Sequence, residues 1–99
     1  MIRLQRSAKI RKMFPETGAW AKGIADFINT KCPDTKVEVF VACYGDISTI
    51  YWYADFDNML ALNNWQRKLM SDAAYWEKIS DAYDFLVVGS IVDTVMVTA

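Results

Sequence analysis

The chain has 99 residues, of which 54% are hydrophobic and 23% charged, so it is apolar enough to fold and long enough for one core. It contains no His, which excludes Ser-His-Asp and Cys-His catalytic sites, and its two Cys are too few for a four-thiolate metal site. No apolar run reaches the ~18 residues that a membrane-spanning helix needs. We therefore expect a single cytoplasmic domain over residues 1–99, with no metal site and no membrane segment.

The first 14 residues carry five Lys and Arg and no acid, whereas the rest of the chain carries six bases and twelve acids. Such a basic segment is typical of a nucleic-acid-binding arm or a transit peptide. However, Ile2, Leu4, Ala8 and Ile10 alternate with polar residues, as in a half-buried strand. We therefore predict that residues 1–10 form a strand of the fold.

Residues 15–31 are predicted to form a helix. Pro15 suits the first helical position, and apolar residues recur at helical spacing as far as Ile28. Pro33 disfavours helix at the residue before it, so the segment ends there.

A hairpin is the clearest local signal, in residues 36–56, where two runs of β-branched and aromatic residues flank a Gly-Asp dipeptide at 45–46. A two-residue linker with Gly first fits a type II′ turn. We therefore predict a tight hairpin that pairs Tyr44 with Ile47 and every earlier residue in step. This register places the following apolar residues on one face: Val37, Val39, Val41, Ile50, Trp52 and Ala54.

Two further helical segments and a strand are predicted after the hairpin. Asp55 or Asp57 caps the first helix, and the Ser-Asp pair at 71–72 caps the second. A β-branched run after the Gly-Ser pair at 89–90 forms the closing strand. The inward stripes of the two helices are predicted to be Met59, Leu62, Trp65 and Leu69, and then Trp76, Ile79 and Tyr83.

The order of these elements is strand, helix, strand, strand, broken helix, strand. This is the βαββαβ order of the ferredoxin-like α+β fold, a four-stranded antiparallel sheet with the helices on one face. The opposite face is left with an aromatic patch larger than a monomer normally exposes to water. We therefore expect a homodimer, with an interface that contains Phe40, Tyr44, Tyr51 and Tyr53.

Three stretches resemble a known family: an aromatic strand that runs into an acidic helix start (YWYADFDNM), DAAYW, and the closing VVGSIVDTV. With the order of the elements, they resemble dimeric α/β-barrel proteins, in particular the NIPSNAP-like and antibiotic-biosynthesis-monooxygenase-like branches. The resemblance implies two sheets that meet face to face and a small organic ligand between the sheet and the helices of each protomer. It also implies cofactor-independent oxygenase or cyclase-like chemistry, because the helix His of the haem-degrading branch is missing here.

The candidate pocket residues are an Arg, an Asn and the four Trp. Arg6 interrupts the apolar side of the first strand, so it either holds an anionic ligand group or has a structural role, in a local bulge or in a salt bridge with a helix acid. The Trp residues on the predicted inward stripes either line a pocket or pack as ordinary core. We predict that this pocket binds a small aromatic or apolar molecule without a cofactor, and whether the protein turns that molecule over is left open. Its residues are Arg6, Trp20, Trp52, Asn63, Trp65 and Trp76.

Two other classes of function fit parts of the sequence. A structural or regulatory dimer without catalysis needs the aromatic face but no pocket. An RRM-like RNA-binding module shares the order of elements and would stack bases on Tyr51 and Tyr53. The first strand, however, offers only Arg3, Gln5 and Ser7 on that face, and the net charge is −1. We therefore expect no nucleic-acid partner.

Overall fold

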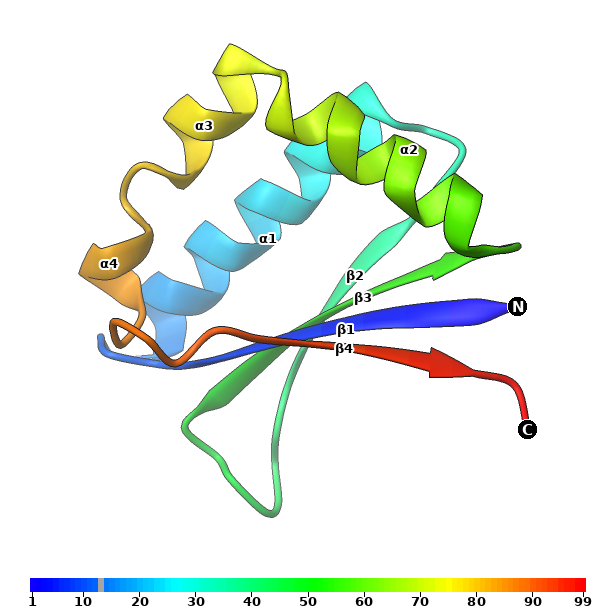
Figure 1. The fold of residues 1–99 in the computed structure, drawn as a ribbon. Helices are drawn as coiled ribbons and strands as arrows, with labels where there is room; N and C mark the ends of the chain where they lie inside the picture. The colour runs from blue at the N-terminus through cyan, green and yellow to red at the C-terminus, as the bar shows by residue number, and fades with distance from the viewer. Residues whose placement is uncertain (13) are drawn as a thin grey trace.

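A computed structural model describes residues 1–12 and 14–99 of the chain. All the helices lie on one side of the sheet, and the two termini lie close together at one end (Figure 1). None of the helices in the described ranges is long and apolar enough to cross a membrane. In chain order the elements are β1 (Ile2–Lys9), α1 (Phe14–Lys31), β2 (Val37–Val41), β3 (Thr49–Phe56), α2 (Met59–Met70), α3 (Ala73–Ile79), α4 (Ala82–Phe85) and β4 (Val92–Val97).

The four-stranded sheet is antiparallel and has the strand order β2-β3-β1-β4, so β1 is a central strand. On one side of β1, Arg6 lies opposite Trp52 of β3, and on the other side it lies opposite Asp93 of β4. The predicted ferredoxin-like fold class is therefore confirmed. The basic N-terminal segment is an integral strand rather than a detached arm.

The register of the β2–β3 hairpin is as predicted, with Val39 opposite Trp52. The predicted tight turn is wrong, because the ladder stops short of it and residues 42–48 form a loop. The expected pairing of Tyr44 with Ile47 therefore does not form.

Asp46 explains why the loop leaves the ladder. Its carboxylate accepts hydrogen bonds from the backbone N–H and the hydroxyl of Ser48 and forms an ion pair with Lys9 of β1. Its carbonyl oxygen accepts the N–H of Thr49 at 3.2 Å. Local bonds from an Asp side chain compete with strand pairing, and here they prevail. Gly45 has a φ of 82°, a backbone conformation that favours glycine.

The Asp46 carboxylate makes stability depend on pH. Its hydrogen bonds, with that from Lys9 the strongest, lower the pKa of Asp46 to about 2. Because an unfolded Asp titrates near pH ~3.9, the carboxylate stabilises the fold above about pH 4, and this contribution is lost as the pH falls through 2. We expect Tm to fall more steeply in this window for the wild type than for Asp46→Asn, which has no carboxylate to protonate. Thermal unfolding followed by circular dichroism tests this, and parallel Tm curves would contradict it.

The core lies between the helix-facing side of the sheet and the helices. The side-chain amide of Asn29 on α1 ties the helix to the start of β2. Its oxygen accepts the N–H of Val37 at 2.7 Å, and its nitrogen donates to the carbonyl of Val37 at 3.0 Å. Side chains in a strand alternate between faces, and the sheet buries those on the helix side. These are Ile2, Leu4, Ala8, Val37, Ile50, Trp52, Ala54 and Phe56.

The start of α2 lies later in the chain than predicted. Strand β3 continues to Phe56, so neither Asp55 nor Asp57 caps the helix. The N-cap is Asn58, whose side-chain oxygen accepts the N–H of Ala61 at 2.9 Å. Asn and Asp are equally good N-caps, so residue type alone did not distinguish the three positions.

Asp72 caps α3 as predicted, and its carboxylate accepts the N–H of Tyr75 at 3.4 Å. The predicted inward stripe is right at Ile79 but wrong at Trp76 and Tyr83, which are exposed. Tyr75 is buried instead. The helix ends at Ile79 and a separate short helix follows, so one helical period does not run through both. Within α3, Tyr75 and Ile79 share the inner face, one turn apart.

Candidate functional site

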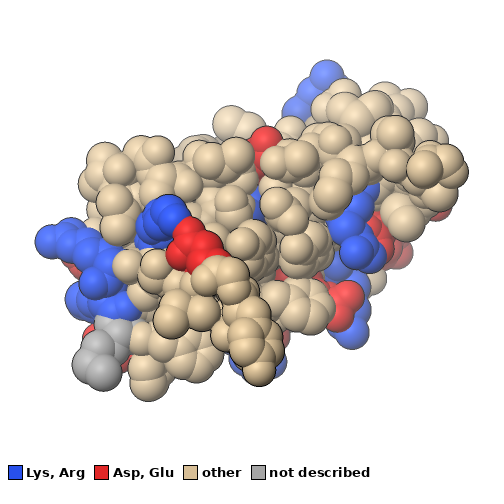
Figure 2. All heavy atoms as spheres, turned by 90° about the horizontal axis from the view of Figure 1, so that it is seen from below, with Lys and Arg blue, Asp and Glu red and all other residues tan. Residues whose placement is uncertain are grey.

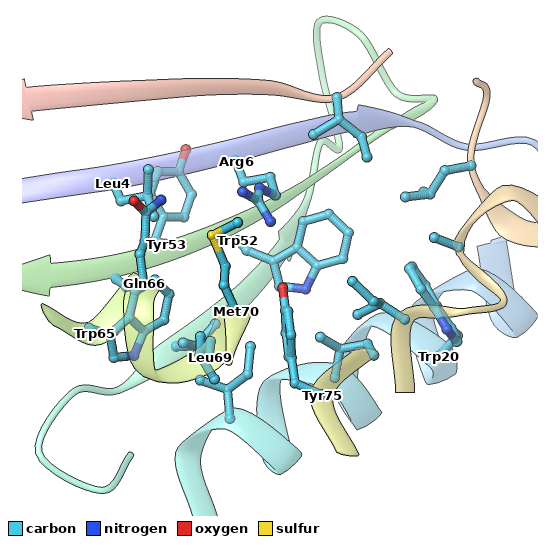
Figure 3. Close-up of a pocket in the computed structure, with 18 residues that line it drawn as sticks. Leu4, Arg6, Trp20, Trp52, Tyr53, Trp65, Gln66, Leu69, Met70 and Tyr75 are labelled. Atoms are coloured by element: carbon cyan, nitrogen blue, oxygen red, sulfur yellow. The ribbon is translucent and has the colours of Figure 1, made fainter. Parts of the chain in front are cut away.

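A cavity of about 150 Å³ lies between the helix-facing side of the sheet and the helices (Figure 3). Strands β1 and β3 line it on one side, and α1, α2 and α3 line it on the other. Most of the lining is aliphatic or aromatic. It includes Leu4, Arg6, Trp20, Trp52, Trp65, Gln66, Leu69, Tyr75 and Ile79.

Trp52 is fixed in the lining by its neighbours. Its Nε1–H donates to the carbonyl oxygen of Ala21 on α1 at 3.3 Å. Trp20 packs against it edge to face, with ring centroids 6.2 Å apart, and stacks on Phe85 at 5.1 Å. Because these contacts hold both indole rings in one orientation, this part of the cavity is preformed.

Trp65 lines the opposite end of the cavity from Trp20, with Trp52 and Tyr75 between them in the view of Figure 3. It packs edge to face on Phe56, with centroids 5.1 Å apart. The buried indole nitrogens of Trp20 and Trp65 have no hydrogen-bond partner within the part of the chain that the structure describes. Buried donors in ordinary cores are nearly always paired, so these two Trp side chains are not explained by packing alone.

A charged pair lies on the sheet side of the cavity. Arg6 faces the helices because it lies two residues from both Leu4 and Ala8 in β1, and these two are buried on the helix side. Its Nε and Nη2 donate to the two carboxylate oxygens of Asp93 on β4, at 2.7 and 2.8 Å. The hydrogen bond with Asp93 raises the pKa of Arg6, and Tyr75 adds to the rise. Of the two predicted roles, the structure shows the salt bridge, although its acid comes from a strand and not from a helix.

The cavity brings together most of the site residues predicted from the sequence. Trp76 lies outside it, because the side chain is 48% exposed and its Nε1–H donates to the carbonyl of Met70 at 2.6 Å. Asn63 is exposed on α2 and does not line the cavity either. Those that do line it are Arg6, Trp20, Trp52 and Trp65.

Two residues of the site were missed by sequence reasoning. Asp93 is the only charged residue in β4, and that isolation within an apolar strand was a usable signal. Tyr75 was overlooked because Trp76 was assigned to the inner face of α3, although Tyr75 and Ile79 have the i, i+4 spacing of one helix face.

The face of the sheet opposite the helices carries an aromatic cluster. Phe40 and Tyr53 pack edge to face with centroids 5.5 Å apart, and Tyr51 stacks on Tyr53 at 6.2 Å. The Tyr53 hydroxyl donates to the side-chain oxygen of Gln5 at 2.8 Å. Phe40 is nevertheless 51% exposed. Tyr44, predicted on the same face, lies in the loop between β2 and β3 and is 93% exposed.

Figure 2 views the molecule from this side and shows a surface made mostly of residues other than Lys, Arg, Asp and Glu. The guanidinium of Arg3 donates to the carboxylate of Asp55 at 2.7 and 2.9 Å, and Lys9 pairs with Asp46. Carboxylates therefore balance the charges of Arg3 and Lys9 on this face.

Strand β4 lies at one edge of the sheet, and all 6 of its residues are exposed. An exposed apolar edge strand favours association with another chain. The exposed apolar residues of β4 and of the segment before it are Val87, Val88, Ile91, Val92, Val95, Met96 and Val97.

No family model matches the chain, and no curated protein matches its sequence. Solved structures of other proteins have the same fold, and the match covers almost the whole of this chain. An uncharacterised NIPSNAP-domain protein from Burkholderia xenovorans has a TM-score of 0.82 at 14% identity, over 100% of this chain and 95% of that chain. A NIPSNAP-family protein from Agrobacterium tumefaciens has a TM-score of 0.80 at 15% identity, over 99% and 92% of the two chains.

Two structures named as an oxygenase and a monooxygenase are similar as well. A variant of SnoaB, a cofactor-independent oxygenase from Streptomyces nogalater, has a TM-score of 0.71 at 6% identity, over 98% of this chain and 91% of that chain. The structure of an antibiotic biosynthesis monooxygenase has a TM-score of 0.69 at 9% identity, over 100% and 99% of the two chains. The chain therefore has the ferredoxin-like fold of NIPSNAP-domain proteins and antibiotic biosynthesis monooxygenases.

Proposed function

We propose that this chain forms a homodimer that binds a small aromatic or apolar molecule in the cavity of each protomer. The observation that carries the proposal is a cavity of about 150 Å³ lined by three Trp residues from β3, α1 and α2. Pockets for small molecules are mostly apolar and largely preformed, with a few polar groups that orient the ligand. Here those groups are Arg6, Gln66 and Tyr75.

The volume of the cavity limits the size of the ligand. A cavity of about 150 Å³ in a protein core accommodates benzene, whereas sites for drug-sized molecules enclose about 300–1,000 Å³. The volume here therefore fits a single substituted ring. The aromatic side chains in the lining favour a flat molecule that can pack against their rings.

Catalysis is the second candidate function, and the likeness to the cofactor-independent oxygenase SnoaB favours it. In this chain a reaction without a cofactor, whether an oxidation by O2 or an acid–base rearrangement, would take place beside Arg6. The N–H groups of Arg6 that Asp93 does not use would donate hydrogen bonds to the substrate oxygen on which charge develops. A ligand-free structural dimer is the alternative if the cavity binds nothing.

The homodimer is proposed from the face of the sheet that the helices leave open. Phe40, Tyr51 and Tyr53 form an aromatic cluster there, and the positive charges of Arg3 and Lys9 are neutralised by carboxylates. An exposed aromatic surface of this kind is suited to a second copy of itself, because a two-fold interface brings the same patch together from both chains.

Toluene tests the cavity, because it is a single ring without charge. At about tenfold excess over Kd, ligand binding stabilises the folded state by ~1.4 kcal/mol. For a domain of this length we expect Tm to rise by about 6–11 °C. Trp fluorescence should change in the same titration, since three Trp side chains line the cavity.

Ile79→Phe is the control for this titration. Ile79 is half-buried in the lining, so a ring at this position occupies the cavity from the helix side. We expect the variant to keep the wild-type Tm and to lose the response to toluene. A wild type that responds to neither toluene nor indole, in Tm or in fluorescence, would contradict the proposed binding function. Oxygen consumption with phenol in the same buffer separates an oxygenase from a binding protein.

A further inference from the structure

We propose that the polar end of the cavity selects a neutral hydrogen-bonding group on the ligand and rejects an anion, because Asp93 already neutralises Arg6. This inference rests on the proposed binding function and specifies the chemical class of its ligand. It differs from the simplest expectation for an Arg in an apolar cavity, which is a carboxylate ligand.

The Arg6–Asp93 pair is built into the register of the sheet. The two residues lie directly opposite each other on β1 and β4, so their side chains leave the backbone on the same face. Both carboxylate oxygens of Asp93 are occupied, by Nε and Nη2 of Arg6. A bidentate contact of this kind fixes the orientation of the guanidinium and neutralises its charge.

The remaining donors at this end of the cavity suit a neutral acceptor. A guanidinium has five N–H donors, and the pair with Asp93 uses the Nε–H and one on Nη2. Arg6, the hydroxyl of Tyr75 and the amide of Gln66 all line the cavity, and the hydroxyl of Tyr75 also interacts with Arg6. These groups can donate hydrogen bonds to a carbonyl or a hydroxyl on the ring. A carboxylate on the ring would instead lie next to the carboxylate of Asp93, and two like charges in a half-buried site repel each other.

The pair on the other face of the same sheet provides a matched control. Arg3 and Asp55 are also cross-strand partners and also form two hydrogen bonds, at 2.7 and 2.9 Å. Their side chains are 46% and 44% exposed, against 38% and 37% for Arg6 and Asp93. The two pairs therefore differ mainly in whether the guanidinium lines the cavity.

Benzamide and benzoate are the probes, since they have almost the same shape and differ in charge at neutral pH. We expect wild-type protein to bind benzamide at least tenfold more tightly than benzoate, measured by calorimetric titration. Asp93→Asn leaves Arg6 without its counter-charge and nearly preserves the side-chain shape. It should raise the affinity for benzoate at least tenfold and change the affinity for benzamide little. Asp55→Asn should leave the ratio of the two affinities within twofold of the wild type.

Four other results would each overturn the inference, and each points to a different cause. Tighter binding of benzoate than of benzamide by the wild type would show that Arg6 accepts anions despite Asp93, and this measurement needs no variant to fold. An equal gain in benzoate affinity in both Asn variants would show a general effect of net charge. Binding of toluene without binding of either probe would show that the polar end is unused, with the binding function intact. No binding of any of the three would overturn the binding function itself.

Discussion

Deletion of residues 1–10 is expected to abolish cooperative unfolding. The deletion removes β1, the strand between β3 and β4, and β4 is then left without any strand beside it. It also removes Ile2 and Leu4 from the core, and each buried aliphatic side chain contributes about 1.5–3 kcal/mol. The two side chains together contribute about 3–6 kcal/mol. With the loss of both ladders, the deficit is comparable with the ~5–15 kcal/mol that holds a typical domain folded.

Circular dichroism and calorimetry measure this result directly. The truncated chain should show no thermal transition and no heat-absorption peak. Removal of Thr98 and Ala99 is the control, because both residues are exposed and lie beyond the end of β4. A truncated chain that melts cooperatively near the wild-type temperature would show that β1 is dispensable, contrary to its central position in the sheet.

Phe40→Lys is expected to dissociate the dimer. Phe40 is 51% exposed in the single chain, so its replacement leaves the core of the protomer intact. In a two-fold interface built on the aromatic cluster, each dimer would contain two buried lysines. A buried charge without a partner is costly, and we expect Kd for dimerisation to rise at least 100-fold, or about 2.7 kcal/mol.

Sedimentation equilibrium at micromolar concentrations should give twice the 11.3 kDa of one chain for the wild type and 11.3 kDa for Phe40→Lys. Tyr83→Lys is the matched control, because Tyr83 is an aromatic residue of similar exposure, 54%, on α4, with the helices on the other side of the sheet. It should remain dimeric. A wild type that is monomeric at these concentrations, or a Tyr83→Lys variant that dissociates equally, would contradict the proposed interface.

The strands and their register were predictable because they depend on local sequence patterns. The alternation of apolar and polar residues predicted β1. The hairpin register followed from the length of the linker and from the separation of apolar residues onto one face of the sheet. The turn was mispredicted because Asp46 binds Lys9, a residue far away in sequence. A two-residue linker indicates a tight turn only when its side chains have no better partners elsewhere.

The cavity was predictable only in part. Trp20, Trp52 and Trp65 were identified because each follows the apolar period of its own element. Arg6 was identified as an exception to the pattern, but its partner Asp93 comes from a strand 87 residues away. No local rule connects two such positions, since the pairing of β1 with β4 is fixed only by the completed sheet. The same long-range geometry decides whether the Arg charge is available to a ligand.

The separation of β1 and β4 in the chain also constrains how the protein folds as it is synthesised. The central strand emerges from the ribosome first, and its neighbour β4 emerges after all the other elements. Until then one edge of β1 is open, and Arg6 has no counter-charge. Pairings between distant segments form slowly, and open strand edges are prone to aggregation. The sheet and the charged pair beside the cavity are therefore completed only after β4 has been synthesised.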